Sequence, residues 1–141
     1  MRRPSAALSV PLALALAACA ENPAGSSVAT GSEFQLRAGE SAAIEGADLG
    51  LRFDLVASDS RCPADAVCVT LGDAEAVFTA AQVGRAPTSL TLHTATRDGQ
   101  RATVGAWTLT LLRLDPYPSS ARPISPGDYR ASLRVDPSAG S

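Results

Sequence analysis

Apolar and polar residues alternate along most of the chain beyond its N-terminal segment. The clearest run covers residues 49–56, where Leu49, Leu51, Phe53 and Leu55 alternate with mostly polar or small neighbours. A period of two over such a length is typical of a β-strand with one face buried and one face in water. The pattern therefore predicts that these four side chains point into a core.

Similar runs predict the remaining strands, and no stretch has a helical period long enough to indicate a helix. These runs lie at 34–37, 43–44, 67–71, 74–78, 90–93, 103–115 and 129–135. The alternation changes parity at Gly72-Asp73, which fits either a two-residue hairpin or a bulge, and again at Leu112, which predicts a second bulge or bend. The pattern predicts an all-β fold, an immunoglobulin-like β-sandwich of about seven strands.

The segment before the last run carries a further sign of a sandwich. Pro126-Gly127-Asp128-Tyr129 leads into the final strand and resembles the tyrosine corner of immunoglobulin-like domains, where the hydroxyl bonds back to the connecting backbone. In those domains another strand follows, whereas here this strand is the last. Ordinary core burial of Tyr129 is the alternative.

The N-terminal segment has a different character. Residues 1–3 include two arginines, and 6–18 form an apolar run too short to cross a bilayer, which takes roughly 20 residues. The run ends in Leu-Ala-Ala-Cys at 16–19, which resembles a bacterial lipobox. The resemblance implies that Cys19 carries lipid as the first residue of the mature protein. An ordinary secretory signal, cleaved after Ala18 or Ala20, is the alternative.

A lipobox also implies a compartment and a domain organisation. Ala20 follows the cysteine where an Asp would be a retention signal, so the resemblance implies export to the outer membrane, facing the periplasm, with the cell surface as the alternative. We expect a lipoprotein signal peptide at 1–18, the lipidated cysteine and a flexible tether at 19–32, the β-sandwich at 33–136 and a disordered tail at 137–141.

Charge limits the partners. Without residues 1–18, the chain has 10 arginines, no lysine and 14 acidic residues, a net charge near −4. A surface of that sign repels nucleic acid and gives no electrostatic grip on anionic lipid. We therefore expect attachment to the membrane through lipid on Cys19, an envelope protein or glycan as partner, and no nucleic acid.

Unusual residues crowd together in one loop. Cys62 and Cys68 lie six positions apart, and a pair of cysteines in an exported chain predicts a disulfide. Closing a loop of this size stabilises by about 2 to 2.5 kcal/mol in the chain-entropy model. The candidate recognition residues of this loop are Asp59, Ser60, Arg61, Pro63 and Asp65. The first two can also bond backbone amides across the turn.

The loop belongs to a longer pattern. Asp-Ser-Arg-Cys-Pro at 59–63, Cys-Val at 68–69 and Gly-x-Ala at 72–74 together resemble a group of small, uncharacterised bacterial lipoproteins and exported domains. The resemblance extends loosely over 34–135, and departs at Thr70, where those proteins often have an aromatic residue. It supports the sandwich and the disulfide and implies no reaction.

The residues that could carry chemistry are too few for a reactive centre. Zinc takes four N or S ligands, and the two cysteines with the lone His93 do not supply them. Asp59, Asp65 and Asp73 match no calcium loop. The sequence has no Gly-x-Ser-x-Gly elbow, no phosphate loop and no evident facing carboxylate pair. We expect neither metal nor cofactor and no enzymatic activity.

These observations predict a non-enzymatic, lipid-anchored lipoprotein of the cell envelope with a binding or structural β-sandwich. The alternative is a periplasmic inhibitor of a protease or lytic enzyme that presents the loop 59–68. The alternative requires the loop to project beyond the sandwich with its tip exposed, since a preorganised loop loses little entropy on binding.

Overall fold

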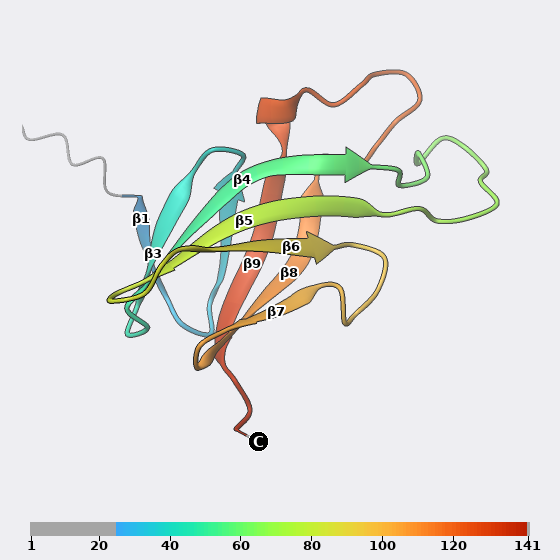
Figure 1. Ribbon diagram of the computed structural model, residues 1–141. Helices are drawn as coiled ribbons and strands as arrows, with labels where there is room; N and C mark the ends of the chain where they lie inside the picture. Colours follow the sequence, from blue (N-terminus) through green and yellow to red (C-terminus); the bar gives the residue numbers. More distant parts are fainter. Residues whose placement is uncertain (1–24, 141) are drawn as a thin grey trace, which may run out of the picture.

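The computed structural model of the protein describes residues 25–140. The predicted signal peptide and the lipidation site Cys19 lie outside these residues. The described chain forms two β-sheets packed face to face, with one disulfide (Figure 1). The predicted all-β sandwich is confirmed. Within the described range, no helix is long and apolar enough to cross a membrane.

Nine strands form the sandwich in residues 25–140, where about seven were expected. In spatial order the first sheet contains β1 (Ser26–Ala29), β3 (Ser41–Glu45), β4 (Leu49–Asp59), β5 (Ala74–Gln82) and β6 (Thr88–His93). The second contains β2 (Glu33–Arg37), β9 (Arg130–Pro137), β8 (Trp107–Asp115) and β7 (Arg101–Val104), and a 3₁₀ turn, η1 (Pro126–Asp128), precedes β9. Every pair is antiparallel except β1 with β3, which is parallel.

The inward faces of the two sheets make one core. Phe53 of β4 and Phe78 of β5 are fully buried and stack with their ring centroids 4.9 Å apart. Leu111 of β8 and Leu133 of β9 are opposite each other in the second sheet and are buried as well. The alternating apolar side chains of the strands therefore form the core between the two sheets, as expected.

Leu55 was expected to point inward, and that prediction is wrong. The pairing of β4 with β5 shifts register between Phe53 and Leu55, as at a β-bulge. A bulge reverses which residues face the core. Leu55 is therefore 47% exposed, while Val56 packs against the core in its place. The bulge expected at Leu112 of β8 is confirmed by a register shift between Leu111 and Arg113.

The long strand expected at 103–115 is two strands. β7 ends at Val104 and β8 begins at Trp107, and these two residues pair across a tight turn. Gly105 in that turn has a φ of 60°, a conformation that glycine adopts without steric cost. The chain therefore reverses where the sequence suggested that it continues.

The expected tether at 19–32 also needs correction. Ser26–Ala29 form strand β1, which hydrogen-bonds to β3, and Val28 packs against the core. The backbone N–H of Gly31 donates to Val135 O at 2.8 Å, which joins the segment to the second sheet. Small and polar side chains do not prevent a strand when its backbone finds partners at a sheet edge.

We predict that Phe53→Ala lowers the free energy of unfolding by about 3 to 5 kcal/mol, because it opens a cavity between the stacked rings. Urea denaturation monitored by Trp107 fluorescence would measure this. Leu55→Ala on the same strand is the matched control, and its half-exposed side chain should cost about 1 kcal/mol or less. Equal losses in the two variants would contradict the bulge.

Candidate functional site

The candidate site is the loop 60–73, which projects from the ends of β4 and β5 beyond the sandwich (Figure 1). We call this segment the cysteine loop. Its base continues the strand pairing through two backbone bonds, Ser60 N to Asp73 O at 2.7 Å and Cys62 N to Leu71 O at 2.8 Å. The loop therefore leaves the sheet as a narrow, paired stalk.

Gly72 closes the base of the cysteine loop. Its φ is 70°, and a Cβ at this position would lie 1.7 Å from Ser60 O. Only glycine fits such a close approach. The Ser60 hydroxyl accepts a bond from Asp73 N and donates one to Asp73 O, so the expected bonding across the turn is confirmed for this residue. Neither the simple hairpin nor the bulge expected at Gly72-Asp73 occurs, because both residues belong to the loop base.

The predicted disulfide joins Cys62 to Cys68, with Cα atoms 5.9 Å apart. Oxidation removes both thiolates, so neither cysteine can act as the zinc ligand considered from the sequence. The bond closes the outer half of the loop, where Ala66 N also donates to Pro63 O at 3.1 Å. The outer half is thus restrained by a covalent bond as well as by the stalk.

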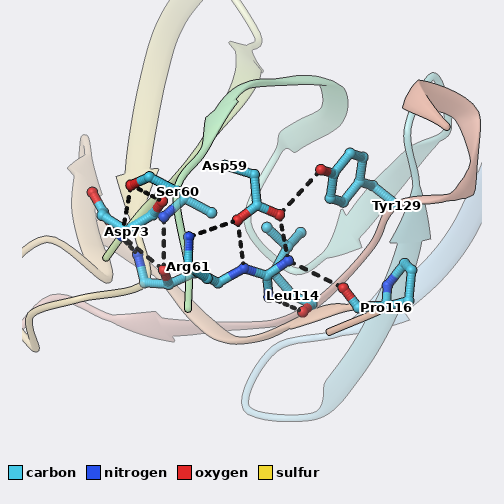
Figure 2. Close-up of polar contacts among 9 residues, drawn as sticks. Asp59, Ser60, Arg61, Asp73, Leu114, Pro116 and Tyr129 are labelled. Atoms are coloured by element: carbon cyan, nitrogen blue, oxygen red, sulfur yellow. Dashed lines mark hydrogen bonds and ion pairs between the residues drawn. The ribbon is translucent and has the colours of Figure 1, made fainter. Parts of the chain in front are cut away.

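A buried ion pair holds the stalk to the second sheet (Figure 2). The Arg61 guanidinium donates from Nε to Asp59 Oδ1 at 2.8 Å and from Nη2 to Asp59 Oδ2 at 2.7 Å. It also donates to the carbonyl of Leu114 at 2.7 Å and to that of Pro116 at 3.1 Å. The Arg61 and Asp59 side chains are only 6% and 10% exposed. The pair therefore links β4 to the end of β8.

Tyr129 completes this group of polar contacts. Its hydroxyl donates to Asp59 Oδ2 at 3.1 Å, and the residue is buried. The expected tyrosine corner is therefore not formed, because the hydroxyl reaches a carboxylate 70 positions earlier in the chain and not the connecting backbone, whereas the alternative, burial of Tyr129, is confirmed. Burial and the Asp59 charge raise the pKa of Tyr129. Partial burial alone would raise the pKa of Asp59, but hydrogen bonds from Arg61 offset it, and the net pKa is lowered.

Asp73 braces the other side of the stalk. Its Oδ2 lies 2.6 Å from His93 Nδ1, and its Oδ1 accepts bonds from the N–H groups of Thr94 and Ala95. Burial raises the pKa of Asp73, but these hydrogen bonds, first that of His93, outweigh it and lower the pKa overall. The His93 side chain lies at the surface and is 39% exposed.

A third contact ties the outer loop to the connection between β8 and η1. Asp65 accepts bonds from the N–H of Ser120, at 2.8 Å, and from the Ser120 hydroxyl. Ala64 N donates to Pro118 O at 3.0 Å. The hydrogen bonds from Ser120 lower the pKa of Asp65. The cysteine loop is thus fixed at its base, along one side and by its disulfide.

The tip beyond these contacts is apolar and open to water. Val67 and Val69 are fully exposed, at 103% and 104%, and Leu71 is 83% exposed. These three residues were expected to lie on a strand with one face buried, and that expectation is wrong. The sheet ends at the pair Asp59 and Ala74, so no neighbouring strand exists for them to cover. We call Val67, Val69 and Leu71 the tip residues, although Leu71 lies where the stalk ends, since its carbonyl accepts the bond from Cys62 N.

The recognition residues predicted from the sequence therefore do not form the tip. Asp59, Ser60 and Arg61 form the stalk, and Asp65 faces Ser120. Pro63 lies at the start of the closed half and is partly buried. One signal could have indicated the tip: 66–71 is an uncharged segment that includes one half of the disulfide. A tightly closed loop cannot also continue as a regular strand.

Asp59, Asp65 and Asp73, the carboxylates that match no calcium loop, each interact with another group of the protein. One three-residue group, Asp73, Glu75 and His93, places its potential ligand atoms within 4.8 Å of one another. Both oxygens of Asp73 already accept hydrogen bonds from β6 and the residues after it. In the described chain His93 bonds to no serine, threonine or cysteine side chain that could serve as its nucleophile.

The chain was compared with protein-family models, curated proteins and solved structures, and none of these comparisons gave a match. The functional argument therefore depends on the residues of the cysteine loop and their surroundings.

We predict that Asp59→Asn lowers the free energy of unfolding at pH 7 by about 3 to 5 kcal/mol, because it leaves the Arg61 charge buried without its partner. Tyr129→Phe is the control, since it removes only one hydrogen bond and should cost about 0.5 to 1.5 kcal/mol. Denaturant titration of both variants would test the difference. Similar losses would show that the ion pair is not what holds the stalk.

Asp59→Asn should also change how the stability of the protein responds to acid. Since the folded-state pKa of Asp59 is below its ordinary value of 3.8, the unfolded chain binds this proton more readily, and stability rises with pH in that region. The contribution is complete above the ordinary value and is lost as pH falls through the folded-state pKa. Between pH 5 and 2, the stability of Asp59→Asn should therefore fall less steeply than that of the wild type. Parallel curves would contradict this assignment.

Proposed function

We propose that the protein is a non-enzymatic, lipid-anchored lipoprotein of the cell envelope that binds a partner protein through the tip residues of its cysteine loop. The observation that carries the proposal is the full exposure of Val67 and Val69 on a braced loop. Apolar side chains gain free energy when they leave water, at about 25 cal/mol per Å². An exposed group of them on a rigid support is typical of a binding surface.

The rigidity of the loop supports binding over a role as a flexible spacer. A loop held by a disulfide, a buried ion pair and two side contacts has lost most of its conformational freedom before it meets a partner. Binding then costs less entropy. In an interface, a few buried apolar anchors of this kind contribute most of the affinity.

The position of the N-terminal strand supports a protein partner over the membrane. Ser26 and Leu51 both pair with Ala42, so β1 is level with the beginning of β4, with β3 between them. Asp59 is eight residues further along, about 26 Å at the spacing of a strand. Figure 1 shows β1 and the cysteine loop on opposite sides of the domain. An anchor at Cys19 therefore leaves the tip free to face away from the lipid.

The full exposure of Val67 and Val69 on a braced loop also favours a second candidate, a periplasmic inhibitor of a protease or a lytic enzyme. Such an inhibitor presents a projecting, preorganised segment to a cleft, and the cysteine loop has that form. The tip residues would enter apolar subsites of the enzyme. The two candidates share the binding surface and differ in whether the partner is a hydrolase whose activity falls on binding.

A photoreactive amino acid at position 67 should crosslink the protein to a specific partner in living cells. Val83 is the matched control, since it is a valine that is 84% exposed at the other end of β5. We expect an adduct from position 67 at least several times stronger than from position 83, identified by mass spectrometry. A hydrolase in the adduct, inhibited by the purified protein, supports the second candidate. Equal labelling from both positions, or adducts with lipid alone, would overturn the proposal.

The anchor has a separate test. We expect Cys19→Ser to move the protein from the membrane fraction to the soluble fraction, because the thiol is the predicted site of lipid attachment. Fractionation followed by immunoblotting measures the shift, and Cys62→Ser with Cys68→Ser is the control that leaves the anchor in place. If Cys19→Ser stays with the membranes, the protein is not a lipoprotein of this kind.

A further inference from the structure

A pocket of about 240 Å³ lies beside the second sheet, away from the tip of the cysteine loop. Three arginines line it together with polar and apolar side chains. The main lining residues are Arg97, Gln100, Arg101, Thr110, Leu112 and Arg134. None of the lining residues is an aspartate or a glutamate, although Glu33 of β2 is opposite Arg134 and Asp136 pairs with it.

Strand register brings two of the arginines together. Arg101 of β7 and Arg134 of β9 are both opposite Thr110 of β8. Their backbones are therefore two strand spacings apart, about 10 Å, and the short threonine lies between them. Thr110 is buried and forms the floor of the pocket. Two arginine side chains standing over a small residue can reach the same bound group.

The third arginine comes from the connection between β6 and β7. Residues 94–100 fold back on themselves through Gln100 N to Thr96 O at 3.0 Å and Arg101 N to Asp98 O at 3.2 Å. Gln100 O accepts a bond from Leu111 N, which fixes this connection against β8. Arg97 on the same connection lines the pocket from a third side.

The charges around the pocket are only partly compensated. Arg134 Nε pairs with Asp136 at 2.8 Å. In the described part of the chain, neither Arg97 nor Arg101 forms an ion pair. Three cations that converge repel one another unless an anion joins them. The pocket therefore has a local positive charge in a protein that is acidic as a whole.

We infer that this pocket binds the phosphate group of a small phosphorylated ligand. Guanidinium groups present pairs of N–H donors that match phosphate oxygens. Two guanidinium groups without an ion-pair partner, beside the paired Arg134, suit a dianionic phosphate better than a carboxylate with a single charge. The pocket is smaller than the roughly 300 to 1,000 Å³ that encloses a whole small molecule. It would accordingly hold the phosphate and leave the rest of the ligand outside.

The test is a titration of the purified protein with its disulfide intact, followed by backbone NMR at low ionic strength. The probes are inorganic phosphate, glucose 6-phosphate and, as the carboxylate comparison, acetate. We expect phosphate to shift the amide signals of Arg101 and Thr110 and to leave those of Val67 and Val69 unchanged. Arg97→Gln with Arg101→Gln should weaken binding about tenfold or more.

Arg85→Ala is the matched control, because it removes the same charge from an exposed position that does not line this pocket. Its affinity for phosphate should equal that of the wild type. Tighter binding of glucose 6-phosphate than of phosphate supports a sugar phosphate as the ligand, and equal binding supports free phosphate. The inference is overturned if neither probe shifts these signals, if acetate binds as well, or if the double variant keeps its affinity. None of these results affects the proposal for the cysteine loop.

Discussion

The buried pair of Asp59 and Arg61 determines where the cysteine loop stands. A guanidinium removed from water is costly unless its donors all find acceptors. Arg61 finds them in Asp59 and, at the end of β8, in the carbonyls of Leu114 and Pro116. Asp59 in turn takes the hydroxyl of Tyr129. One ion pair thus joins the stalk to the second sheet, and the direction of the tip follows from it.

Period-two alternation was enough to predict the class of fold, because burying one face of each strand is what forms a sandwich. The departures have local causes. Leu55 and Val56 exchange roles at a bulge, and a bulge depends on how the neighbouring strand pairs. The turn at Gly105 splits one expected strand, and β1 forms from a segment with little apolar content. Pairing between backbones leaves little trace in side-chain patterns.

The candidate site was predictable in part. Two cysteines in a chain predicted to be exported indicated the disulfide, and the crowding of polar residues indicated the loop. The contacts that set its geometry join residues far apart, such as Arg61 to Leu114 and Asp65 to Ser120. A single sequence gives no measure of such distances. Charged residues therefore looked like the recognition surface, although they brace the loop, and the exposed valines looked like part of a core strand.

The parallel pairing of β1 with β3 has a mechanical consequence. In a lipid-anchored protein, tension from the membrane would enter the domain at the start of β1. A pull along a strand that lies side by side with its neighbour strains all of their shared hydrogen bonds at once in shear, rather than opening them one after another. The edge strand would then act as a clamp between membrane and sandwich. The cysteine loop, on the opposite side of the domain, would meet this force only where a partner holds the tip.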